Sequence, residues 1–141
     1  MSNLQAFMAQ NVMKAEVEEH EVSPRFKEDG KTIKWHFGAI DGNKDAAIRK
    51  ECTRRVPVPM KKGMTMPELD GNRYSLKLAV ETIVHPNLNN VELQKSYGAM
   101  DAEGLLQKML LPGELTKVKE LVQTINGFDL SMDELVEEAK N

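Results

Sequence analysis

The segment Thr32–Ile40, TIKWHFGAI, predicts the fold most firmly because its apolar and polar residues alternate. Side chains along a β-strand point to opposite faces in turn. Ile33, Trp35, Phe37 and Ala39 are therefore expected to share one face of a strand.

A second strand is expected over residues 14–22, where acidic and apolar residues alternate more loosely. Residues 23–30, between the two strands, contain proline, aspartate and glycine, which favour turns. Together they predict a β-hairpin over residues 14–40. Residues 3–12 could form a short helix that needs a surface to pack against, with three apolar residues on one side: Leu4, Phe7 and Met8.

After Asp41 the apolar residues recur at the spacing of short helices. Capping boxes are indicated at Asn89 with Glu92 and at Ser131 with Glu134. The expected helices run from Asn43 to about Arg55, from Asp70 or Asn72 to Val84, from Asn89 to Gly98, from Asp101 to Pro112, from Leu115 to Gly127, and from Ser131 onward.

These elements predict a mainly α fold with a small β-hairpin (α+β), in which an N-terminal two-stranded hairpin precedes a bundle of five to six short helices. A single domain is expected over residues 1–141, with a hairpin region at 14–40 and a helical region at 43–141. Residues 56–69, VPVPMKKGMTMPEL, interrupt the helices with three prolines, one glycine and three methionines. We expect a loop without regular structure there, and such loops are usually functional or mobile.

Composition narrows the class of protein. The chain has 40% hydrophobic and 29% charged residues and a net charge of −3, as ordinary globular domains do. Its apolar runs are too short to cross a bilayer, and no secretory signal is visible near its start. The single cysteine, Cys52, suits a reducing cytoplasm. Aromatic residues are only 5%, while nine methionines offer adaptable apolar surface.

The residues that catalysis or metal binding would need are not grouped. Neither a GxGxxG nor a GxxxxGK[ST] motif occurs, and His20, His36 and His85 are isolated in the sequence. Cys52 could be a nucleophile activated by nearby arginines, but its helical spacing with Ile48 favours a buried position. We therefore expect no enzyme, no metal site and no cofactor.

Charge is distributed unevenly along the chain. Residues 44–62 hold seven basic residues against two acidic ones, whereas residues 129–141 hold five acidic residues against Lys140. Solvated faces would explain both segments; complementary contact between copies would also explain them. The basic run lacks interleaved aromatics and the chain is acidic, which argues against nucleic-acid binding. The residues predicted for self-association are Arg49, Arg54, Arg55, Glu137 and Glu138.

Five segments resemble the XkdN-like tail assembly chaperones of phages and phage-derived elements, and they extend over almost the whole chain. They are LQAFMAQN (4–11), RKECTRRVPVP (49–59), HPNLNNVELQKSYG (85–98), LLQKMLLPGE (105–114) and INGFDLSMDELVEEAKN (125–141). The resemblance implies a non-enzymatic chaperone that keeps the hydrophobic, helical tape-measure protein soluble until the tail tube polymerises. It also implies action in the host cytoplasm, absence from the virion, and in some relatives a longer frameshifted form as partner.

Met60, Met64 and Met66 are the predicted client-binding residues, since no local pattern buries them and a holdase needs an adaptable surface. The competing interpretation is that their loop packs on its own domain or only links two helices. Two other classes of function also fit the sequence: a small structural tail component, and a nucleic-acid-binding regulatory protein of a prophage.

Overall fold

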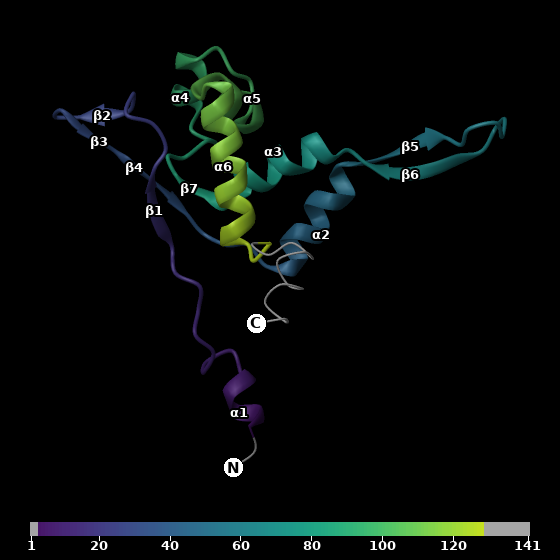
Figure 1. The fold of residues 1–141 in the computed structure, drawn as a ribbon, viewed down its shortest axis with the longest axis horizontal. Coiled ribbons are helices and arrows are strands. Elements are labelled where there is room, and N and C mark those ends of the chain that lie inside the picture. Colours follow the sequence, from purple (N-terminus) through teal and green to yellow (C-terminus); the bar gives the residue numbers. More distant parts are fainter. Residues whose placement is uncertain (1–2, 129–141) are drawn as a thin grey trace, which may run out of the picture.

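The computed structural model describes residues 3–128. Helices and strands are interspersed along this range (Figure 1). The helices are α1 (Leu4–Phe7), α2 (Gly42–Glu51), α3 (Gly71–Thr82), α4 (Val91–Ser96), α5 (Ala102–Met109) and α6 (Pro112–Ile125). The strands are β1 (Glu18–Glu21), β2 (Lys27–Glu28), β3 (Lys31–Thr32), β4 (Lys34–Phe37), β5 (Thr53–Pro57), β6 (Thr65–Leu69) and β7 (Ile83–His85).

The strand expected from the alternation is β4, and it lies at the centre of an antiparallel sheet between β1 and β7. His20 of β1 lies opposite Trp35 of β4. Trp35 and Phe37 are buried, with 2% and 0% of their surface exposed, whereas Ala39 lies beyond the end of the strand and is exposed. The alternation thus identified the two aromatic residues that anchor the sheet to the core.

The turn between β1 and β4 contains a smaller hairpin of its own. β2 pairs with β3, and Lys27 lies opposite Thr32. Asp29 and Gly30 connect the two strands with φ of 51° and 79°. Positive φ at both central residues is the geometry of a type I′ turn, which suits the right-handed twist of a two-residue hairpin.

The predicted architecture, one N-terminal hairpin followed by a helical bundle, is wrong because strands recur along the described chain. β7 follows α3 and pairs with β4, so that Ile83 lies opposite Phe37. The helix was expected to continue to Val84. It ends at Thr82 because β-branched residues and the residue before Pro86 both favour extended backbone.

The prediction of a structureless loop over residues 56–69 is also wrong. Most of that stretch belongs to a β-hairpin in which β5 pairs with β6, from Thr53 opposite Leu69 to Pro57 opposite Thr65. The preceding helix, expected to reach Arg55, ends at Glu51 because the chain joins β5 from Thr53 onward. The prolines do not prevent this pairing, because the nitrogens of Pro57 and Pro67 face away from the partner strand.

Side chains cap the N-termini of α2, α3, α4 and α5. Asp101 is the cap that the sequence predicts, and Asp70 is one of the two predicted for α3, whereas Asp41 and Asn90 replace the expected Asn43 and Asn89. The carboxylate or amide oxygens of these caps accept backbone N–H groups of Lys44, Arg73, Leu93 and Gly104.

Glycines end two helices as the sequence predicts. Gly98 and Gly127 have φ of 67° and 87°. The next residue in each case donates its N–H back into the last turn, Ala99 to Gln94 at 2.8 Å and Phe128 to Gln123 at 2.8 Å, as in a Schellman ending. Pro112, expected to end a helix, instead begins α6, since proline at a first helical position loses no hydrogen bond. The helix predicted from Ser131 lies outside the described residues.

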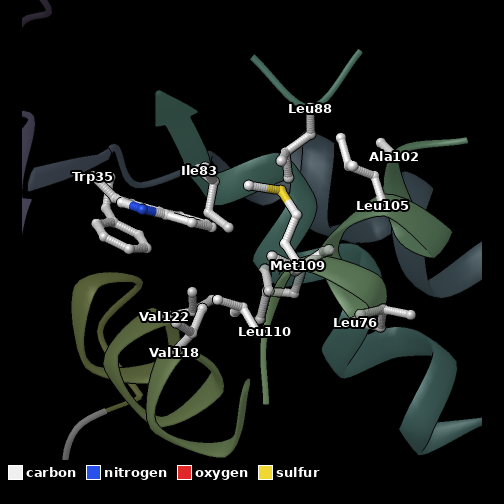
Figure 2. Packing of buried hydrophobic residues seen from close by; sticks show 14 of the residues in the cluster. Trp35, Leu76, Ile83, Leu88, Ala102, Leu105, Met109, Leu110, Val118 and Val122 are labelled. Carbon is white, nitrogen blue, oxygen red and sulfur yellow. The ribbon is translucent and has the colours of Figure 1, made fainter. Parts of the chain in front are cut away.

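The core lies between the β1–β4–β7 sheet and the helices α3, α5 and α6 (Figure 1). Leu78, Leu105 and Leu106 are fully buried in it. Figure 2 shows Trp35 beside Ile83, with side chains of α5 and α6 gathered below and to the right. Among residues 3–128 no helix is long and apolar enough to span a membrane.

Candidate functional site

The β5–β6 hairpin projects from the body of the molecule, beyond the N-terminal end of α3 (Figure 1). Each of its residues is exposed except Val56 and Val58, which are half-buried. A two-stranded ribbon is marginally stable by itself in water, so its side chains must support each other or contact something else. The hairpin is therefore the leading candidate for a binding surface.

The register of the hairpin gathers apolar side chains on one of its faces. Val56 lies opposite Met66, and the next pair on that face is Val58 with Met64, joined by the Val58 N–H and the Met64 carbonyl at 3.0 Å. Residues directly opposite each other in an antiparallel pair point to the same side. We call these four residues (Val56, Val58, Met64 and Met66) the apolar face. Met64 and Met66 are 53% and 44% exposed.

The turn that closes the hairpin adds a third methionine and two positive charges. Met60 has φ of 63° and is fully exposed, and Gly63 has φ of 77°. Lys61 and Lys62 lie between them. A shallow hollow at this end is lined by residues that include Met60 and Met64. The structure therefore places all three predicted client-binding residues on one exposed hairpin.

The prolines of the hairpin protect its edges. The Val58 N–H points toward β6, and N–H groups alternate between the two sides of a strand, so the nitrogen of Pro57 faces outward. Pro67, opposite Arg55, occupies the equivalent outward position on β6. Proline at these positions removes no hydrogen bond from the ladder and blocks another strand from pairing with the edge. Binding is therefore expected at a face of the hairpin.

The arginines predicted for self-association already have partners within the chain. The Arg49 side chain donates to Asp45 at 2.8 Å and lies over the ring of Tyr74. The Arg54 guanidinium lies 3.7 Å from Asp70 and 3.9 Å from Glu68. In addition, Arg55 donates to the hydroxyl and carbonyl oxygens of Thr65. Glu137 and Glu138 lie outside the described residues, so contact between these two groups stays a prediction.

Cys52 lies in the core, with 2% of its surface exposed. Burial raises the pKa of its thiol, which disfavours the reactive thiolate. The rings of His36 and His85 stand 5.0 Å apart on neighbouring strands, but within residues 3–128 no three ligating side chains gather where they could hold a metal ion.

Sequence reasoning named the three methionines but not the valines that complete the apolar face. The signal was present, because Val56, Val58 and Met60 alternate, as do Met64 and Met66. Alternation of this kind predicts a strand. The interspersed prolines hid it, since proline is normally taken as a break in a strand.

Three comparisons place the chain among known proteins. A family model described as phage XkdN-like tail assembly chaperone protein matches residues 4–140. The uncharacterized protein YqbN of Bacillus subtilis (strain 168) is 33% identical over 142 residues, which cover 99% of this chain and 93% of YqbN. Phage-like element PBSX protein XkdN of the same organism is 28% identical over 142 residues, covering 99% of this chain and 94% of XkdN.

The fold agrees with these matches. The crystal structure of the protein YqbN aligns with a TM-score of 0.77 at 28% sequence identity, and the alignment covers 90% of this chain and 98% of that one. Because the family model extends over nearly the whole sequence, its match concerns the body and the hairpin alike. The chain belongs to the phage XkdN-like tail assembly chaperone proteins.

Proposed function

We propose that this chaperone binds the tape-measure protein during phage tail assembly and keeps it soluble until the tail tube polymerises, and that the apolar face of the β5–β6 hairpin and Met60 contact this client. The observation that carries the proposal is an exposed apolar face on a projecting hairpin of a tail assembly chaperone. The tape-measure protein would present repeated apolar helix faces to this surface. The chaperone would work in the host cytoplasm and be absent from the finished particle.

The side chains of the apolar face suit such a client. Methionine has an unbranched, polarizable side chain that adapts to partners of varied shape. An amphipathic helix binds by laying its apolar side on a complementary apolar surface. Val56 and Val58 are half-buried and would form the more rigid part of this surface. Met64 and Met66 are more exposed and would adapt to successive turns of the client helix.

The test is co-expression of the chain with the tape-measure protein, followed by size-exclusion chromatography with light scattering. The wild-type chain should recover the client in a soluble complex. Replacing Met60, Met64 and Met66 together with serine should lose most of that complex, because the apolar face then offers little surface to bury. The intrinsic fluorescence of Trp35, which is buried in the body, checks that each variant is folded.

A matched control separates this face from apolar surface in general. Met100 and Val91 are 96% and 59% exposed and lie outside the hairpin, so the Met100→Ser/Val91→Ser variant should bind the client as the wild type does. A triple-serine variant that is folded and still retains the client would exclude the hairpin as the binding site. Equal loss in both variants would show that binding depends only on total exposed apolar area.

Self-association through Arg49, Arg54 and Arg55 with Glu137 and Glu138, and partnership with a longer frameshifted form, are separate proposals. The first predicts oligomers that dissociate as salt rises, because exposed charge pairs are screened. Oligomers that are indifferent to salt and to reversal of charge at Glu137 and Glu138 would contradict it.

A further inference from the structure

The N-terminal arm, residues 3–17, is a second projecting segment of the molecule. It leads from the start of β1 to α1 and extends away from the sheet and helices, on a different side from the hairpin (Figure 1). All its residues are exposed. Its large apolar side chains are 40% exposed or more: Leu4, Phe7, Met8, Val12, Met13 and Val17.

The arm has too little structure of its own to be stable in this form without a partner surface. α1 has four residues, far fewer than an isolated helix needs to persist in water. The Asn11 amide donates to the Gln5 carbonyl at 2.8 Å, which folds the turn after α1 without covering its apolar side. Exposed apolar residues gathered on one short segment mark a site of contact with another protein surface.

We propose that the N-terminal arm of one copy of this chain lies on the apolar face of the β5–β6 hairpin of a second copy. The arm presents Leu4, Phe7 and Met8, and the hairpin presents an exposed surface of valine and methionine. The outward-facing Pro57 and Pro67 disfavour addition of the arm as a further strand. Contact through side chains on the face is the arrangement that remains.

Charge supports this choice of partner. Glu16 lies in the arm near β1 and Glu21 is the last residue of β1, whereas Lys61 and Lys62 lie in the turn at the tip of the hairpin, between Val58 and Met64. Within residues 3–128 none of these four side chains is engaged in an ion pair, whereas Arg54 at the base of the hairpin is paired with Glu68 and Asp70. An arm that lies on the apolar face with its acidic end toward the tip would bring opposite charges together.

The proposed contact is head-to-tail, because the arm and the hairpin are different surfaces. Each copy would offer one arm and one hairpin, so that copies add in sequence and form either a ring or an open chain. The client is proposed for the same face, so it would have to displace the arm, but the contact between copies forms and is tested without the client. Failure of this proposal would therefore leave the proposed function untouched.

Cross-linking between two differently tagged chains tests the contact. One chain carries Phe7→Cys and the other Met66→Cys, with the buried Cys52 left in place, and a short bis-maleimide is added to the mixture without client. We expect a covalent dimer that joins residues 7 and 66. Its yield should fall when Lys117→Cys, on the exposed side of α6, replaces Met66→Cys, and the wild-type mixture should give none.

A second measurement follows the free protein by light scattering. The mass of the wild type should increase with protein concentration, the Phe7→Ser variant should lose this increase, and high salt should reduce it. Absence of the dimer that joins residues 7 and 66 would overturn the proposal. Cross-linking of 7 to 66 only when both cysteines are in one chain, with a monomeric mass, would overturn it in favour of the chain's own arm as occupant.

Discussion

Glu114, near the start of α6, connects three parts of the molecule through its carboxylate. Arg25, which follows β1, donates to it at 2.5 Å, and the same guanidinium donates to the Met109 carbonyl at the end of α5 at 2.9 Å. The Leu111 N–H donates to Glu114 at 2.8 Å, which satisfies one of the free donors at the start of the helix. A single side chain thus joins the sheet to the α5–α6 corner.

These partners determine how stability should depend on pH. Hydrogen bonds from Arg25, Ser23 and Leu111 lower the pKa of Glu114 from 4.5 to about 2. A lowered pKa in the folded state means that the ionised carboxylate stabilises the fold at neutral pH, and that this contribution is lost as the pH falls from about 4.5 toward 2. Urea unfolding monitored by Trp35 fluorescence should therefore show a steeper loss of stability with acid in the wild type than in Glu114→Gln. Parallel pH profiles would contradict this.

At the scale of elements, the ends of helices are set by local chemistry that can be read from the sequence. α4 ends at Ser96, and Gly98, two residues further on, has a φ of 67° that residues with a Cβ adopt at a cost. The Gly98 carbonyl also accepts a hydrogen bond from the Lys108 ammonium at 2.7 Å, so this ending is tied to α5.

Replacing Gly98 with alanine should destabilise the fold by about 1 kcal/mol, because alanine must adopt the left-handed conformation. Steric overlap adds little, since the nearest atom to the new Cβ is the Lys108 Nζ at 3.7 Å. Thermal unfolding measures the effect. Gly71→Ala is the matched control, because Gly71 lies in helix α3 and nothing stands within 4 Å of its Cβ position. An equal melting temperature for Gly98→Ala and wild type would contradict the prediction.

At the scale of the whole molecule, Asn126 links elements that are far apart in sequence. Its side-chain oxygen accepts the Ile40 N–H at 2.9 Å, just after β4. Its side-chain nitrogen donates to the Thr82 hydroxyl, at the end of α3, at 2.9 Å. The Thr82 side chain is fully buried. The end of α6 is thereby fastened to the sheet and to the central helix.

Asn126→Ala should cost roughly 1–3 kcal/mol of the free energy of unfolding, since it leaves the buried Thr82 hydroxyl without its partner. The control is the Asn126→Ala/Thr82→Val pair, in which both polar groups are removed. Its cost should be smaller than the sum of the two single changes, because the orphaned hydroxyl is gone. Additive costs, measured by urea unfolding, would show that the two side chains are not coupled.

The sequence by itself determined part of the local structure. Alternation identified β4 and its buried pair Trp35 and Phe37, and capping chemistry located the N-terminus of α5 at Asp101 and the glycine ending of α4. These predictions succeeded because each depends on backbone preferences and side-chain hydrogen bonds within a few residues. The same locality let the sequence single out the methionines of the hairpin as unburied.

Only the tertiary structure decided how distant segments meet. Strand β7 forms because Ile83 pairs with Phe37 of β4, 46 residues earlier in the chain, and no local pattern encodes this pairing. The apolar face depends on the register that sets Val56 opposite Met66, and a slip of one residue would turn these side chains to the other face. Register and long-range pairing are properties of two segments together, so they follow from packing and ladder hydrogen bonds that the order of residues in one segment does not contain.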